Sequence, residues 1–230
     1  MPTILYIDTA TDLASVCISS DERVLGITES SDQKNHASFI QSAIAELCAQ
    51  TGTALPTLDA VAVTAGPGSY TGLRVGMATA KGICYALQKP LIALTTLEVM
   101  AQAALSKSGI AATPAALLCP MIDARRMEVF TALFDQSMRT KKTAHALIID
   151  EQSFAAELEQ DAVLFFGSGM PKFKHLIQHT NALFTDIKHN ATDMVLPALA
   201  AFRSSHFTDL AYSEPVYVKE FFSPTKLESN

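Results

Sequence analysis

Apolar positions follow two different rhythms along this chain of 230 residues. Short apolar runs are typical of strands, and they alternate with segments in which apolar residues recur every three or four positions, as on one face of a helix. In the first half, the pattern predicts strands at 3–8, 14–19, 23–28, 60–64 and 91–94. It predicts helices at 36–50 and 95–105, and a third helix that follows the glycine-rich segment after the fourth strand and ends at about residue 87. The first three strands are joined by short turns and must be antiparallel, whereas the later ones alternate with helices, so we expect a mixed sheet.

The second half of the chain repeats this order. Strands are expected at 115–122, 128–134, 145–149, 163–166 and 183–184, and helices at 151–158, 171–179 and 193–202. The repeat predicts the α/β class with two lobes, at residues 1–107 and 108–215, followed by an extended tail at 216–230. Two such lobes side by side are expected to form a cleft for a ligand or a partner.

Composition narrows the class of protein. Hydrophobic residues make up 49% of the chain and charged residues 17%, which is typical of a folded globular protein. The longest apolar stretch is broken by Pro114 and Pro120, so we expect no membrane span; the start of the chain has no signal-peptide pattern, which favours the cytoplasm. Four widely spaced cysteines in apolar segments are expected to be reduced and buried.

Five of the ten glycines lie in residues 65–82, AGPGSYTGLRVGMATAKG. This segment matches neither of the common phosphate-binding glycine motifs, because no Lys-Ser/Thr follows and Thr71 stands where a third glycine belongs. Gly72, Gly76 and Ala80 recur every four residues and line one face of the predicted helix. Glycine inside a helix costs roughly 1 kcal/mol relative to alanine, so a packing reason is expected, either within the chain or against a partner.

Two further patterns could carry chemistry. Asp8, Thr9 and Thr11 end the first strand and resemble the first phosphate loop of the actin-like ATPase and sugar-kinase superfamily, although such residues are also ordinary in turns. They are the candidate nucleotide-binding residues. His175 and His179 have the spacing of a zinc pair, but a glutamate and a third ligand are missing, so no metal site is predicted.

Several motifs together resemble one family, the bacterial TsaB (YeaZ) proteins. The motifs are residues 7–11, His36, residues 66–76 and residues 122–129. The resemblance implies an actin-like ATPase (ASKHA) fold of two ribonuclease-H-like lobes. It also implies a non-catalytic role beside TsaD, with TsaE, in the complex that makes threonylcarbamoyladenosine at adenosine 37, beside the tRNA anticodon. No cofactor is expected on the chain alone, and the resemblance leaves room for ATP or ADP in the assembled complex.

One departure from the catalytic relatives supports a non-catalytic role. Where the resemblance places their metal-binding H-x-E-x-H helix, this chain has Thr96 and Met100 in the histidine positions, with Glu98 retained. Neither replacement offers an imidazole to a metal ion. Met127 also stands where relatives commonly have glycine, which questions the local turn geometry. The alternative is a stand-alone actin-like ATPase or kinase, for which the second half offers only Gly167-Ser-Gly169 as a phosphate loop.

The expected partner surface combines an apolar stripe on the first helix with the small-residue ridge on the second. It comprises His36, Ile40, Ile44, Leu47, Tyr70, Thr71, Gly72, Arg74, Gly76, Met77 and Ala80. If the same surface binds either TsaD or a second copy of this chain, the heterodimer and the homodimer exclude each other. The alternative is that the apolar stripe of the first helix faces the chain's own sheet and binds no partner. A net charge of −6 with scattered basic residues predicts weak tRNA binding by the isolated chain, so tRNA is expected only through the complex.

Overall fold

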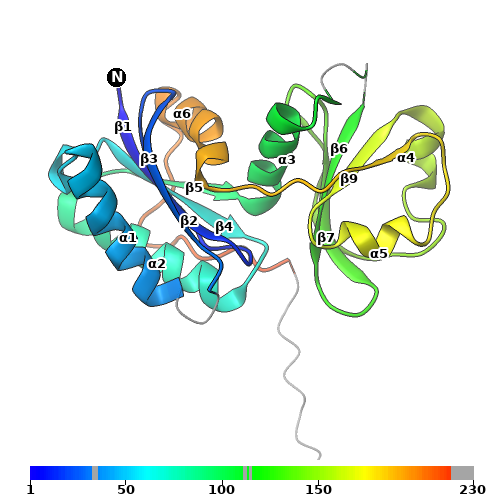
Figure 1. The fold of residues 1–230 in the computed structure, drawn as a ribbon, viewed down its shortest axis with the longest axis horizontal. Helices are drawn as coiled ribbons and strands as arrows, with labels where there is room; N and C mark the ends of the chain where they lie inside the picture. The colour runs from blue at the N-terminus through cyan, green and yellow to red at the C-terminus, as the bar shows by residue number, and fades with distance from the viewer. Residues whose placement is uncertain (33–35, 111–112, 114–115, 219–230) are drawn as a thin grey trace, which may run out of the picture.

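A computed structural model describes residues 1–32, 36–110, 113 and 116–218, which form two lobes with one five-stranded sheet each (Figure 1). In the first sheet the order is β3-β2-β1-β4-β5, from β1 (Thr3–Asp8), β2 (Ala14–Ser20), β3 (Arg23–Ser30), β4 (Ala60–Gly66) and β5 (Leu91–Thr95). In the second sheet it is β10-β9-β6-β7-β8, from β6 (Leu117–Asp123), β7 (Glu128–Phe134), β8 (Thr140–Ile148), β9 (Val163–Phe166) and β10 (Ala182–Phe184).

Both sheets have the same mixed topology. The first three strands of each lobe pair in antiparallel fashion, and the two later strands extend the sheet in parallel. The predicted α/β class and the internal repeat are therefore confirmed. This order, with three meandering strands and two crossovers, is that of a ribonuclease-H-like lobe.

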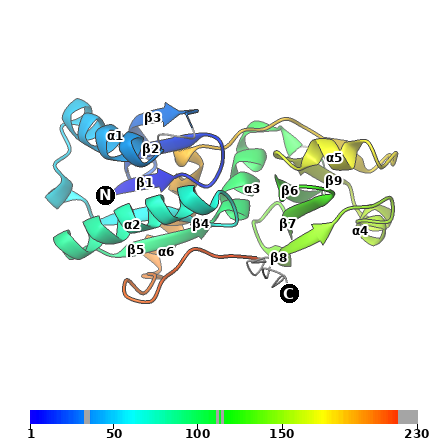
Figure 2. The ribbon, with the colours of Figure 1, turned by 90° about the horizontal axis from the view of Figure 1, so that it is seen from below.

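The helices are α1 (His36–Thr51), α2 (Tyr70–Leu87), α3 (Thr96–Lys107), α4 (Ala155–Gln160), α5 (Met170–Lys174) and α6 (Val195–Arg203), with short 3-10 turns η2 (Leu55–Thr57) and η4 (Ala191–Met194). Helix α2 begins at a Ser69 cap and ends at Gln88 in the left-handed conformation. Helices α1 and α2 lie side by side on one face of the first sheet (Figure 2). Within the described residues, no helix has both the length and the apolar composition to cross a membrane.

Helices α3 and α6 lie where the repeat did not predict them. Helix α3 lies between the sheets, with Val99 in the core of the first lobe and Met100 in the core of the second. Helix α6 and η4 return to the first sheet, where Ala198 packs in one core cluster with Ile4 and Tyr6. The expected lobe at 108–215 is thus corrected: residues 191–203 pack on the first sheet, because their apolar side covers the face that α1 and α2 leave open.

The C-terminal segment, residues 204–217, also runs along the first lobe (Figure 2). Thr208 pairs with Leu91 at the edge of β5, and the backbone N–H of Val216 donates to the carbonyl of Ala65 at 2.6 Å. The predicted tail at 216–230 begins beside this anchor, and its residues 219–230 lie outside the described part of the chain.

The cysteines give a first testable prediction. Cys17, Cys84 and Cys119 are buried, and burial raises the thiol pKa to about 12, 11 and 12, respectively. Cys48 is only partly buried. Because the thiolate is the reactive form, a thiol reagent should modify Cys48 first and the other three only on unfolding. Mass mapping after brief labelling of the native chain checks this, and a Cys48→Ser variant should then show almost no fast labelling.

Candidate functional site

The two lobes face each other across a cleft of about 1260 Å³, as the two-lobe repeat predicted. The first lobe lines it with residues 10–13 after β1 and residues 68–71 at the start of α2. The second lobe contributes residues 122–125, residues 167–168 with their neighbours in α5, and residues 186–189. Most of these are loop and helix-end residues, and residues 122–123 end β6; α/β folds commonly bind ligands at such strand ends.

Asp8, the last residue of β1, is fully buried beside this cleft. Its Oδ1 accepts hydrogen bonds from the backbone N–H of Ala10 at 3.1 Å and from the Thr64 hydroxyl at 2.9 Å. Its Oδ2 lies 3.3 Å from Nε2 of His189. That distance is short enough for an ion pair, but the ring is not aligned for a good hydrogen bond, so we treat the contact as electrostatic.

These contacts control the ionisation of Asp8. Burial raises the pKa of the carboxyl, but the attraction of His189 and the bonds from Ala10 and Thr64 outweigh burial, so the pKa lies below its usual value. Asp8 is thus an ionised group engaged by its own chain. Thr9 is also buried, with its hydroxyl donating to the carbonyl of Gly72 at 2.7 Å. Of the three residues predicted to contact a nucleotide, only Thr11 lines the cleft.

The glycines of α2 have an internal packing reason. A Cβ added at Gly72 would clash with the carbonyl oxygen of Thr9, and one added at Gly76 would clash with the Thr9 hydroxyl. The Gly72/Gly76 face therefore lies against the end of β1, so that the start of α2 can sit directly over residues 8–10. The alternative of close packing within the chain is correct for these two glycines.

The predicted partner surface needs a larger correction. Seven of its residues are buried in the first lobe: Ile40, Ile44, Leu47, Gly72, Gly76, Met77 and Ala80. The stripe of α1 packs on the chain's own sheet, because an amphipathic helix buries its apolar face against the nearest apolar layer. Tyr70, Thr71 and Arg74 are exposed, as predicted. His36 begins α1, and its side chain lies outside the described residues.

The exposed residues at the start of α2 meet the C-terminal segment. The Arg74 guanidinium lies 4.0 Å from the centre of the Tyr70 ring, and its Nε donates to the Tyr217 hydroxyl at 3.1 Å. The rings of Tyr70 and Tyr217 are 5.5 Å apart. This cluster was missed from the sequence, because Tyr217 is separated from Arg74 by more than half of the chain and no local pattern links them.

The residues compared with a metal-binding helix fill the space between the lobes. Thr96 is fully buried. The methyl group of Met100 lies against Gly167, so closely that a Cβ added at Gly167 would clash with it. Glu98 is partly buried, and burial raises the pKa of its carboxyl. Within the described residues, no group of three or more His, Cys, Asp or Glu side chains is placed to hold a metal ion.

Two loops differ from expectation. In the turn from β6 to β7, Arg125 and Arg126 both adopt left-handed backbone conformations (φ 69° and 49°), so the unusual geometry falls on the arginines and not on Met127. The predicted helix at 171–179 is shorter, because α5 ends at Lys174. His175 and His179 therefore do not share a helix face, and Nδ1 of His179 instead accepts the N–H of Asn181.

Comparisons with known proteins agree on one family. Residues 13–220 match the family model described as "TsaD: tRNA N6-adenosine threonylcarbamoyltransferase". The chain is 31% identical, over 98% of its length and 97% of the relative, to the tRNA threonylcarbamoyladenosine biosynthesis protein TsaB of Haemophilus influenzae. It is 29% identical to the protein of the same name from Escherichia coli, over 97% of each chain.

Solved structures give the same result. YeaZ from Pseudomonas aeruginosa superposes with a TM-score of 0.81 at 26% sequence identity, covering 94% of this chain and all of that one. A second structure, described as similar to the peptidase YEAZ from the same organism, superposes with a TM-score of 0.84 at 26% identity over 95% of this chain and 100% of that chain. The likeness extends across both lobes, whereas the sequence motifs lay mainly in the first.

Proposed function

The chain belongs to the family of the tRNA threonylcarbamoyladenosine biosynthesis protein TsaB, and we propose that it acts in this biosynthesis as a non-catalytic scaffold that pairs with TsaD. In this proposal the chain works in the cytoplasm, TsaE completes the complex, and tRNA and any ATP or ADP are held by the assembly. The internal contacts of Asp8 and Thr9 support a scaffold over a stand-alone ATPase, because both side chains are already engaged within the first lobe.

The surface that we propose for TsaD is the outward side of α1 and α2. The helices contact each other, and Gln41 of α1 donates to the Thr79 hydroxyl of α2 at 3.4 Å. Their exposed faces carry small residues at helical spacing: Ser42, Ala45, Ala49, Ala78, Gly82 and Ala86. Small side chains on two neighbouring helices allow the helices of a second protein to approach closely. This surface replaces the buried stripe that the sequence pattern had indicated.

Gly82 is the observation that carries this proposal. It lies inside α2 and is exposed, and, apart from its chain neighbours and the backbone of its own helix, no described atom lies within 4 Å of a Cβ added there. Glycine at such a position costs the helix about 1 kcal/mol relative to alanine. Unlike Gly72 and Gly76, it has no packing reason within the described part of the chain, so contact with another protein is the explanation that we favour.

Gly82→Leu tests the proposed surface. We expect the variant to fold, because the side chain would enter open space, and to lose capture of TsaD by at least about tenfold, since a central clash of 1.4 kcal/mol or more has this effect. Co-purification with tagged TsaD and a tRNA modification assay with each subunit omitted measure capture and function.

The matched control is Ala200→Leu, which adds an exposed leucine-sized side chain to α6, away from α1 and α2. It should bind TsaD as the unmodified chain does. If Gly82→Leu captures TsaD as well as the unmodified chain does, the contact lies elsewhere. If a second copy of this chain binds the same face, the isolated chain should form a dimer that TsaD dissociates. Modification that proceeds without this chain would refute the scaffold role itself.

A further inference from the structure

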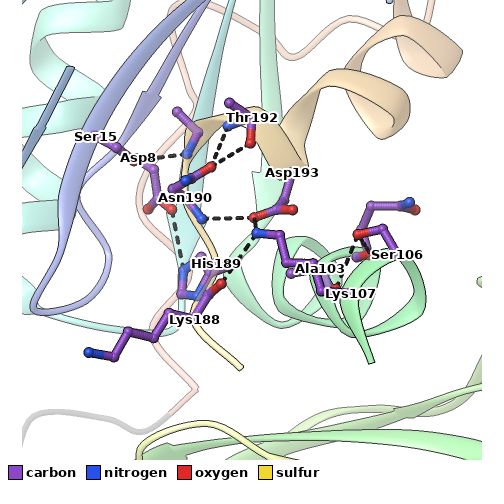
Figure 3. A network of polar contacts seen from close by, with 12 residues as sticks. Asp8, Ser15, Ala103, Ser106, Lys107, Lys188, His189, Asn190, Thr192 and Asp193 are labelled. Atoms are coloured by element: carbon purple, nitrogen blue, oxygen red, sulfur yellow. Dashed lines mark hydrogen bonds and ion pairs between the residues drawn. The ribbon is translucent and has the colours of Figure 1, made fainter. Parts of the chain in front are cut away.

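We propose that the two lobes of this chain are locked at a fixed angle by contacts of the return segment, residues 185–190, so that the cleft keeps its width without a ligand. The return segment is the extended stretch that crosses from β10 in the second lobe to η4 on the first (Figure 1). Two-lobed proteins move about such crossings unless specific contacts hold them. Here the crossing carries a dense set of polar contacts, shown in Figure 3.

The first contact joins the return segment to the buried end of β1. His189 is only 7% exposed, and its Nε2 faces Oδ2 of Asp8, which is fully buried. Among the described residues, neither atom has a well-aligned hydrogen-bond partner, so their 3.3 Å contact is the polar contact that each atom has. Moving the segment away would leave Oδ2 of the buried carboxylate without a polar partner, since the bonds from Ala10 and Thr64 both go to Oδ1, and this loss is costly. The contact therefore holds His189, near the end of the return segment, against the first lobe.

The second contact joins the return segment to α3, the helix between the sheets. Lys107, at the end of α3, donates to the carbonyl of Lys188 at 3.3 Å and to Oδ2 of Asp193 at 2.7 Å. Asp193 also accepts the N–H of Asn190 at 2.9 Å, as part of the capping box that begins η4. Lys107 thus bonds on both sides of His189, to Lys188 within the return segment and to Asp193 in η4.

A third set of contacts fastens the end of the segment to the first sheet. The N–H of Ala191 donates to the Ser15 hydroxyl on β2 at 2.8 Å, and the Asn190 amide donates to Glu29 on β3 at 2.8 Å. Residues 188–193, from the end of the return segment into η4, are therefore tied to β1, β2, β3 and α3. A hinge needs backbone torsions that can change, and these bonds oppose such a change at the crossing.

The test measures the distance between the lobes in the isolated chain. Spin labels are placed on Gln50→Cys in α1 and Glu159→Cys in α4, both exposed, in a Cys48→Ser background. Pulsed dipolar spectroscopy then gives the distribution of distances. We expect one narrow distribution that Mg-ATP does not move. His189→Ala and Lys107→Met should each broaden it about twofold, because each frees the crossing.

Lys142→Met is the matched control, because it removes an ion pair with Glu157 that lies wholly within the second lobe. It should leave the distribution unchanged. Three results would each overturn the proposal. The first is a distance distribution of unchanged width in both His189→Ala and Lys107→Met, and the second is equal broadening in the control. The third is a shift of the distribution of the unmodified chain when Mg-ATP is added. Should His189→Ala not fold, Lys107→Met decides, because the lysine is 40% exposed and its loss is tolerated more easily.

Discussion

Gly72→Ala should destabilise the chain by about 3 kcal/mol or more, although it adds only one methyl group. The added Cβ would clash with the Thr9 carbonyl, a backbone atom that cannot rotate away. Relief would require α2 to move from the end of β1, and Gly72 also accepts the Thr9 hydroxyl and donates its N–H to Ser69. Urea denaturation at neutral pH, read as the free energy of unfolding, measures the loss.

Gly82→Ala provides the control, because it is the same substitution in the same helix. There the new methyl group meets open space, and the better helix propensity of alanine should stabilise the chain by up to about 1 kcal/mol. The two variants are therefore expected to change stability in opposite directions. A loss of under about 1 kcal/mol for Gly72→Ala would mean that α2 shifts easily and that its glycines are not held by the end of β1.

Asp8→Ala should be the second strongly destabilising change, with a loss of about 3–5 kcal/mol at neutral pH. The substitution leaves the Thr64 hydroxyl, the Ala10 N–H and the buried His189 without the carboxylate that they contact. A carboxylate placed mainly to bind a ligand behaves in the opposite way, since its removal usually costs little stability or even increases it. The stability of this variant thus distinguishes a structural Asp8 from a phosphate-site acid.

The pH dependence has a definite sign. Because the folded pKa of Asp8 lies below its usual value, the ionised carboxylate stabilises the fold at pH values above the unfolded pKa, and this contribution is lost as the pH falls through the folded pKa. The stability difference between the unmodified chain and Asp8→Ala should therefore shrink on going from neutral pH to below about pH 4. Denaturation across that range measures it.

Asp12→Ala is the appropriate comparison. Asp12 lines the cleft four residues away and is exposed, so its removal should change the free energy of unfolding little. An Asp8→Ala variant that is as stable as Asp12→Ala would contradict the structural role and return Asp8 to the candidates for ligand binding.

Much of the fold was readable in the sequence. The strands at 60–64 and 163–166, and the end of the helix at about residue 87, appear in the structure within a few residues, because apolar periodicity is a local property. The internal repeat also predicted two mixed sheets correctly. The glycine segment matches neither phosphate-binding motif, which the sequence alone can state because such motifs depend on residue identity at fixed spacing.

What the apolar stripe of α1 touches was decided only by the tertiary structure. An amphipathic pattern predicts that Ile40 and Leu47 are buried, but the surface that buries them can belong to the same chain or to another protein. The same ambiguity applied to the glycines of α2. Gly72 is explained by Thr9, 63 residues earlier in the chain, whereas Gly82 has no such neighbour within the described residues.

The sequence by itself therefore determined the elements, their order and the family, because these depend on short-range pattern and on motif. The tertiary structure decided which residues meet across long separations. His189 reaches Asp8 from 181 positions away along the chain, Lys107 reaches Asp193, and α6 crosses back to the first sheet. Such pairings follow from how packed layers bury their apolar faces and compensate their buried charges, and one sequence carries no local signal for them.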